Sequence, residues 1–307
     1  MGKVRGVLLE MGLFAQLLCA FFIGGAFGST GEGPSECCQD FVVELCSIAT
    51  KKYRSAFATQ GDMTAYFATL LKSVNLRYTD MTRPKIRFQL NNVTVVDDSE
   101  VIKRHRGRRT VDAAKTLIKL MKFLTNGCCA SCDVVFLFTS ESMEFFRSNK
   151  YDGVNGVALP GSVCTAKKVG VVNDIPHSYS SSRTLSHELA HTLGATHDGD
   201  GPLNLTYSHP GAKSCPFNGG YLMGEGNHGP RKYTLSDCTV EQIQAHYSTL
   251  ESTCIDVQGP SYTSNKYPGQ DMTPEKLCSL LLGNKATHRQ SKTCRRGQCG
   301  VHNWAET

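Results

Sequence analysis

Apolar and polar positions follow two different periods over the first half of the chain. Residues 85–90 alternate strictly, which is typical of a half-buried strand, and the apolar run at residues 133–138 is typical of a central strand. Residues 41–45 predict a further strand. Apolar side chains at helical spacing predict helices over residues 63–76 and 111–124. This order of elements predicts an α/β fold with a mixed, twisted sheet.

The composition changes near residue 257. Two turn-forming stretches, Gly259-Pro260 and Tyr267-Pro268-Gly269, lie in a segment that contains three cysteines and little apolar sequence. A tail of this size cannot bury a good apolar core, so we expect it to depend on disulfides. The sequence therefore predicts a main domain over residues 29–256 and a small disulfide-rich tail over residues 257–307.

The N-terminus has the features of an export signal. Lys3 and Arg5 form a basic region, an apolar run follows over residues 11–27, and small residues precede a cleavage point after Gly28. The alternative is a membrane anchor. The run is short for a span and has no basic flank behind it, and no later segment is long and apolar enough to span a membrane. We therefore predict a signal peptide over residues 1–28 and a soluble, secreted mature protein.

Composition narrows the class of protein further. With 40% hydrophobic and 20% charged residues, the 307-residue chain is not expected to be disordered, and a formal charge of +6 is too small to indicate nucleic acid as a partner. Its 14 cysteines favour export, a bound metal or both. Loss of Cys19 with the signal leaves an odd number (14 − 1 = 13), so one cysteine is expected to lack a partner. Asn92 and Asn204 begin sequons for glycosylation.

The sequence from His187 to His197, His-Glu-Leu-Ala-His-Thr-Leu-Gly-Ala-Thr-His, carries the strongest chemical signal. On a helix, His187 and His191 project from one face and can share a metal ion. Neutral imidazole is a preferred ligand of zinc. Glu188 stands where its carboxylate can reach a water at the metal without being a ligand. Gly194 can adopt positive φ and turn the chain back, so that His197 completes a site with three ligands and one open position, as in catalytic zinc sites. A chance match is the alternative, and the fixed offsets of Gly194 and His197 make it improbable.

This motif, with Asp198 directly after it, resembles the zinc signature of the metzincins, and in particular the reprolysin (ADAM and ADAMTS) branch. Residues 154–172, with a Gly-Ser-Val-Cys turn, and residues 235–247 agree with that branch. Residues 267–278 are similar to the opening of the ADAMTS disintegrin-like module. The resemblance covers about residues 40–300, and the compact form looks like secreted arthropod salivary or venom reprolysins, particularly those of ticks.

The resemblance implies roles for further residues. Met223 would form the Met-turn beneath the zinc-binding histidines, and Asp198 would fix the segment under the helix without touching substrate. A peptide would lie antiparallel to an edge strand, with a specificity pocket near Met223 whose wall includes residues 225–233. Several reprolysins also hold a calcium ion near the first strand, where Glu44 is a candidate ligand, although a Glu in a strand is usually just solvated.

The sequence departs from the reprolysin pattern at its N-terminus. Reprolysins are usually made with a long propeptide whose cysteine caps the zinc, but residues 29–40 alone separate the predicted cleavage point from the first strand. Cys37 and Cys38 lie in that stretch outside any recognisable switch motif, and we expect them to form disulfides.

Five cations and no acid occur between residues 103 and 109: Lys103, Arg104, Arg106, Arg108 and Arg109. The simplest interpretation is a solvated loop. A second is an exosite for anionic glycans or acidic protein surfaces. A third is a processing site, because residues 106–109 resemble a furin-type sequence, but cleavage there would nick the domain instead of releasing a propeptide.

Together these features predict a secreted zinc endopeptidase that hydrolyses peptide bonds of extracellular proteins, with Glu188 as the general base and His187, His191 and His197 as ligands. The alternative is a catalytically silent binding protein that uses the same fold and the cysteine-rich tail to engage matrix or receptor partners. The intact motif favours the enzyme. A structural zinc protein is disfavoured by the open fourth position.

Overall fold

The protein is described by a computed structural model for residues 40–225, 229–270, 272–273, 276–277 and 279–280. The predicted signal peptide, Cys37 and Cys38, and the three cysteines of the tail lie outside these residues. No helix in the described part of the chain is long and apolar enough to cross a membrane.

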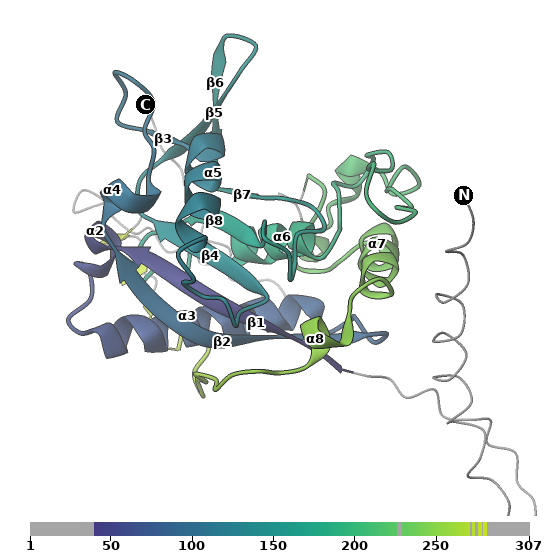
Figure 1. Ribbon diagram of the computed structural model, residues 1–307, viewed down its shortest axis with the longest axis horizontal. Coiled ribbons are helices and arrows are strands. Elements are labelled where there is room, and N and C mark those ends of the chain that lie inside the picture. The colour runs from purple at the N-terminus through teal and green to yellow at the C-terminus, as the bar shows by residue number, and fades with distance from the viewer. Residues whose placement is uncertain (1–39, 226–228, 271, 274–275, 278, 281–307) are drawn as a thin grey trace, which may run out of the picture. The chain divides into compact units, whose positions relative to one another are not determined.

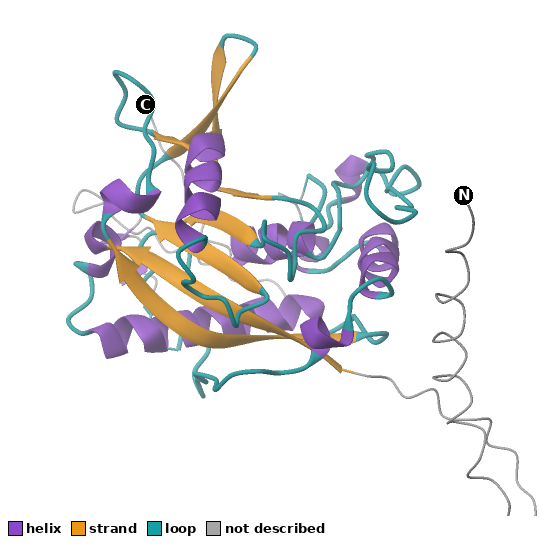
Figure 2. Ribbon diagram, viewed as in Figure 1, coloured by secondary structure: helices purple, strands orange, loops and turns teal. Residues whose placement is uncertain are grey.

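A five-stranded sheet in the order β2-β1-β4-β8-β7 forms the centre of the fold (Figures 1 and 2). Four strands are parallel: β1 (Asp40–Thr50), β2 (Lys85–Val96), β4 (Val134–Thr139) and β8 (Val169–Asn173). The short strand β7 (Gly156–Ala158) pairs antiparallel with β8 and leaves its other edge free within the sheet. The mixed sheet predicted from periodicity is confirmed, and the continuous apolar run at β4 is buried along its whole length between β1 and β8.

Helices cover both faces of the sheet. One face packs against α3 (Gln60–Asn75) and α6 (Ser182–Thr192), and the other against α5 (Ala113–Leu124). The expected helix at residues 111–124 begins two residues late, because Val111 and Asp112 form the strand β3 and the Asp112 side chain accepts a hydrogen bond from Lys115 N at the start of the helix. The remaining helices are short or follow the zinc-motif region: α2 (Lys51–Arg54), η1 (Leu76–Tyr78), α4 (Asp98–Val101), η2 (Phe217–Gly219), η3 (Pro230–Tyr233), α7 (Asp237–Tyr247) and α8 (Ser252–Ile255).

A second sheet, of β3, β5 (Met143–Arg147) and β6 (Lys150–Val154), was not expected from the sequence. Its β5–β6 hairpin projects from the body of the molecule just before β7 (Figure 1). The hairpin turn is made by Ser148 and Asn149, both of which adopt positive φ, as two-residue hairpin turns require. Neither residue is a glycine, so the turn signal is weak in the sequence.

Three disulfides lie in the described residues: Cys46–Cys132, Cys164–Cys254 and Cys215–Cys238. They join β1 to the start of β4, the loop before β8 to α8, and the loop after the zinc motif to α7. The vicinal cysteines Cys128 and Cys129 are free in the structure. A cysteine framework of this kind supports the disulfide-bonded protein that was predicted.

The chain after α8 packs against the sheet edge formed by β2. Glu44 is fully buried, and its carboxylate accepts hydrogen bonds from Gln258 N (2.8 Å), Gly259 N (2.7 Å) and the side chain of Asn91. The expectation that a Glu in β1 would be solvated is therefore wrong, because the returning chain covers it. Tyr262 N then donates to Leu90 O at 2.8 Å, so the first residues of the predicted tail run along β2.

Candidate metal centre

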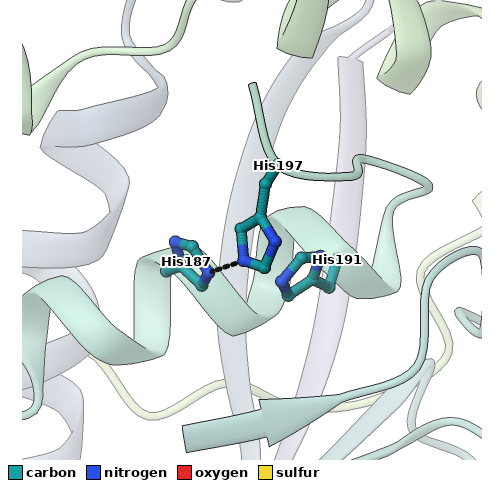
Figure 3. A group of neighbouring side chains, drawn as sticks. All are labelled: His187, His191 and His197. Carbon is teal, nitrogen blue, oxygen red and sulfur yellow. Dashed lines mark hydrogen bonds between the residues drawn. The ribbon is translucent and has the colours of Figure 1, made fainter. Parts of the chain in front are cut away.

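Helix α6 ends at Thr192, and the chain must reverse direction after it for His197 to approach His187 and His191. Gly194 has a φ of +106°, its N–H donates to His191 O at 2.8 Å, and Ala195 N donates to Ala190 O at 2.9 Å. This pair of hydrogen bonds closes the helix in a Schellman arrangement, for which glycine is favoured. The turn brings His197 back over α6, beside His187 and His191 (Figure 3).

The three histidine side chains offer ligand nitrogens that all lie within 4.8 Å of one another. Nδ1 of His187 lies 2.9 Å from Leu222 O, and Nδ1 of His191 lies 2.7 Å from Ala195 O. Because a carbonyl oxygen only accepts, these two Nδ1 atoms carry the protons and their Nε2 atoms present lone pairs to the shared space. Such second contacts are the usual way in which a metal-binding imidazole is oriented.

Burial favours the neutral, ligating form of His187 and His191. Burial lowers the pKa of His187 to about 4 and also lowers the pKa of His191 well below its usual value. Nε2 of His187 and Nε2 of His197 approach to 3.1 Å, a distance that suits two ligands of one cation. Three imidazoles with no carboxylate among them fit zinc or a related transition metal, and do not fit calcium or magnesium.

Glu188 lies against the edge strand β7. It is 5% exposed, and its carboxylate accepts a hydrogen bond from the N–H of Ala158. Burial raises the pKa of Glu188 to about 8. This carboxylate lies one residue from a metal-ligand candidate and against a free strand edge. It is therefore placed to exchange a proton with a group bound between the helix and the strand.

Met223 and Asp198 are both buried, and a backbone hydrogen bond joins them. Asp198 N donates to Met223 O at 3.1 Å, and its carboxylate accepts a hydrogen bond of 2.6 Å from Ser236 Oγ. The neighbouring Leu222 carbonyl holds His187, as described above. The turn around Met223 thus supports His187 directly and anchors the segment that carries His197.

One supporting group could not be predicted from sequence. Asp174 is fully buried and accepts hydrogen bonds from Tyr53 OH (2.6 Å), Tyr66 OH (2.8 Å) and Ser181 N (2.9 Å), the last at the residue that precedes α6. The two tyrosines come from α2 and α3, far away in the chain. The only local signal was an acidic residue shortly before a predicted helix.

The predicted surface sites have different outcomes. Asn92 and Asn204, the predicted glycosylation sites, are both exposed.

In the basic run, Arg104 forms an ion pair with Glu141, and Arg108 pairs with both carboxylate oxygens of Glu144 at 2.8 and 3.0 Å. Both side chains stay exposed, as expected of a solvated loop, but acids from the following β-hairpin region neutralise their charges. Lys103, Arg106 and Arg109 are exposed.

Comparisons with known proteins agree with this geometry. The sequence family described as Metallo-peptidase family M12 matches residues 40–234. A "disintegrin and metalloproteinase with thrombospondin motifs like" protein of Bombyx mori is 25% identical over 252 residues, 76% of this chain and 36% of that protein. The venom metalloproteinase antarease-like TtrivMP_A of the scorpion Tityus trivittatus is 34% identical over 133 residues, 42% of this chain and 34% of that protein. The chain thus spans about a third of the length of these two relatives.

Among solved structures, metalloproteinase-II from Bacteroides fragilis is similar with a TM-score of 0.41 and 16% identity, over 69% of this chain and 55% of that chain. A likeness of this size supports no conclusion about function.

Proposed function

We propose, from the premise that this chain belongs to metallo-peptidase family M12, that it is a secreted zinc endopeptidase acting on extracellular proteins. One observation carries the proposal. His187, His191 and His197 present convergent imidazoles, and Glu188, which follows His187 in α6, is buried against a free strand edge. Zinc bound to these histidines would polarise the scissile carbonyl and increase the acidity of the attacking water.

The strand β7, Glu188 and Ala158 would each have a separate role in the reaction. The free edge of β7 can pair with an extended peptide and hold its scissile bond over α6. The carboxylate of Glu188 accepts the proton of the attacking water and passes it to the leaving amine. The N–H of Ala158, which donates to this carboxylate, fixes its direction and favours its ionised form.

A cleavage assay on a denatured protein, with and without a chelator, tests the proposal. Glu188→Ala should retain one zinc per chain and lose about 10²–10⁴-fold in kcat/KM, because the proton acceptor is gone. Glu241→Ala removes an exposed glutamate from α7 and serves as the matched control, which should cleave like the parent. Equal rates for Glu188→Ala and the parent would refute the role of Glu188. A zinc-loaded parent that cleaves nothing would favour the silent binding protein instead.

Secretion and processing are part of the same proposal. We expect expression in a secreting cell to yield a mature N-terminus at Ser29, with residues 29–256 as the catalytic domain and residues 257–307 as a disintegrin-like tail. The disulfides support an oxidising compartment. Peptide-N-glycosidase should reduce the mass of the secreted protein, and the reduction should disappear when Asn92 and Asn204 are both replaced by Gln.

The anionic-glycan exosite rests on fewer residues than the sequence indicated, because Arg104 and Arg108 are paired. We expect heparin retention to fall when Lys103, Arg106 and Arg109 become Gln. Changing Arg104 and Arg108 instead should have a smaller effect. Unchanged retention in the triple variant would exclude the exosite.

The calcium proposal concerns Glu44 and Asp133. Burial raises the pKa of Asp133 to about 6, and this carboxylate accepts a hydrogen bond from Glu44 N at 2.7 Å, so two buried acids lie together. Donors from the chain already occupy the oxygens of Glu44 and hold Gln258 and Gly259 in place. A rise in melting temperature with calcium, absent with magnesium and lost in Glu44→Gln, would support a bound calcium. An unchanged melting temperature would leave Glu44 as an anchor for the returning chain alone.

A further inference from the structure

Within the described residues, the ring of His197 is less firmly held than those of the other two candidate ligands. Nδ1 of His187 and Nδ1 of His191 each donate to a backbone carbonyl oxygen. Nδ1 of His197 faces Oδ2 of Asp200 at 3.6 Å, which is beyond ordinary hydrogen-bond distance. The side chains of His197 and Asp200 are 46% and 58% exposed, so solvent weakens this contact further. The place of the third ring therefore depends on how the backbone around it is held.

Gln242 in α7 holds the backbone directly before His197. Its Oε1 atom accepts one hydrogen bond from Thr196 N at 2.9 Å and a second from Thr196 Oγ1 at 2.8 Å. Gln242 is fully buried and Thr196 is 4% exposed, so both hydrogen bonds are shielded from solvent. Consecutive Cα atoms are only about 3.8 Å apart, and a displacement of Thr196 therefore passes directly to His197.

The amide group of Gln242 is fixed at both of its ends. A backbone N–H only donates, so Oε1 of Gln242 must face Thr196, and Nε2 then donates to Cys238 O at 3.0 Å. Cys238 lies in the first turn of α7 and is bonded to Cys215 in the loop after the zinc motif. Gln242 thus reaches Thr196 from a helix that is covalently attached to the loop on the other side of the motif.

The chain after His197 is held by backbone contacts that lead to the same disulfide. Gly199 N donates to Ala212 O at 2.9 Å, and Ala212 N donates to Asp200 O at 2.8 Å. Ala212 precedes Cys215 by three residues. These backbone contacts therefore support the C-terminal side of His197, and the glutamine of α7 supports its N-terminal side.

We propose that Gln242 is a positioning residue that holds His197 in its ligating place and thereby sets the zinc affinity of the three-histidine site. The inference rests on the proposed function, because it concerns the same metal centre. Gln242 acts through Thr196 and not as a ligand, since two hydrogen bonds already occupy its oxygen. Removal of such an outer partner typically weakens metal binding about 10–100-fold. A role in packing alone would leave zinc affinity unchanged.

The experiment measures the dissociation constant of zinc by competition with a chelator of known affinity. Gln242→Met keeps the length of the side chain and removes both the acceptor for Thr196 and the donor to Cys238. We expect the Kd for zinc to rise about 10–100-fold. Gln244→Met is the matched control on the same helix. The amide of Gln244 donates to Arg83 O at 2.7 Å, outside the zinc motif, so this variant should bind zinc like the parent.

Thr196→Val tests the same contact from its other side. It removes the Oγ1 hydrogen bond but keeps the N–H donor, so its Kd for zinc should rise about 2–10-fold, as expected for one hydrogen bond. Added to Gln242→Met, the change should raise the Kd no further, because the shared acceptor is already gone. Fully additive effects of the two substitutions would contradict the proposal. If Gln242→Met fails to fold, Thr196→Val decides alone, and an unchanged Kd would overturn the positioning role.

Urea unfolding with and without zinc distinguishes positioning from packing. The loss of stability in Gln242→Met should be larger for the zinc-loaded protein, because weaker zinc binding reduces the stabilisation that zinc provides. Equal losses with and without zinc, together with an unchanged Kd, would leave Gln242 with a packing role only. These measurements need no turnover. A parent that binds zinc and cleaves nothing would therefore refute the peptidase without affecting the result for Gln242.

Discussion

Gly156 in β7 lies so close to Glu188 in α6 that a Cβ atom at position 156 would stand 2.7 Å from Oε1 of Glu188. It would also stand 2.6 Å from Cγ2 of Thr184. Both distances are shorter than van der Waals contact, so the absence of a side chain is what lets the strand edge approach the candidate proton acceptor.

The first prediction follows from this contact. Gly156→Ala should move the Glu188 carboxylate or the strand edge by a few tenths of an ångström to one ångström, and a displacement of that size can cost about 10²-fold in kcat/KM. Zinc content should not change, because the three atoms nearest to the added Cβ belong to Thr184 and Glu188 and not to a histidine. Gly153→Ala in β6 is the matched control, since its Cβ would meet nothing within 4 Å. Full activity in Gly156→Ala would show that β7 yields without disturbing Glu188.

The second prediction concerns the turn at Gly194. An alanine there would have to adopt a φ of +106°, and its Cβ would lie 2.8 Å from Cβ of His246 and 2.9 Å from the Tyr207 hydroxyl. We expect Gly194→Ala to lower the free energy of unfolding by about 1–3 kcal/mol and to weaken zinc binding, because His197 follows the turn directly. Urea unfolding and a zinc titration measure the two effects.

Gly107→Ala separates backbone strain from collision in this experiment. Gly107 also has positive φ, +73°, but a Cβ there would meet nothing within 4 Å. The loss in the free energy of unfolding of Gly107→Ala should therefore reflect the strained backbone conformation alone. Its zinc binding should be unchanged. If both variants lost the same stability and both bound zinc normally, the packing of His246 and Tyr207 around the turn would be unimportant.

The parts of the fold that sequence could predict are those that depend on local pattern. The strict alternation at residues 85–90 and the apolar run at β4 follow from burial on one face and on two faces of a sheet. The spacing of His187 and His191, and the conformational freedom of Gly194, are likewise local, so the geometry of the three histidines could be anticipated from the motif.

Features that join distant segments could not be predicted. Asp174 depends on tyrosines more than 100 positions earlier, and the pairing of Arg108 with Glu144 depends on a hairpin with no glycine in its turn. Glu44 was expected to be solvated because nothing near it indicates that residues 258–259 return to cover it. In each case the deciding partner lies far away in the chain, where periodicity carries no information.

The third prediction tests the group that supports the start of α6. Asp174→Ala would leave two tyrosine hydroxyls and the Ser181 N–H without their buried acceptor. We expect a loss of about 3 kcal/mol or more in the free energy of unfolding, because unsatisfied buried donors cost about 1–3 kcal/mol each. Asp62→Ala, which removes an exposed capping carboxylate from α3, should cost only about 1 kcal/mol. Equal losses in the two variants would contradict the role of Asp174 as a buried hub.

The fourth prediction concerns pH and His246. This side chain is 6% exposed, stacks on Tyr207 with ring centres 5.2 Å apart, and lies near His209, and burial lowers its pKa below the usual 6.5. The folded protein therefore keeps His246 neutral under conditions in which the unfolded chain protonates it. Since the unfolded state then binds more protons, stability is full above about pH 6.5 and falls as the pH decreases below that value.

Replacing the titrating ring isolates this contribution. His246→Phe keeps a flat ring against Tyr207 but cannot be protonated, although it loses the hydrogen bond to the Leu193 carbonyl. We expect the variant to be less stable than the parent at pH 7.5, and the difference to shrink at pH 5.5, because only the parent loses stability as the unfolded chain protonates this ring. Urea unfolding of both proteins with zinc present measures this change, and titration of the other histidines cancels in the comparison. A stability difference that stays constant between the two pH values would mean that His246 titrates equally in the folded and unfolded states.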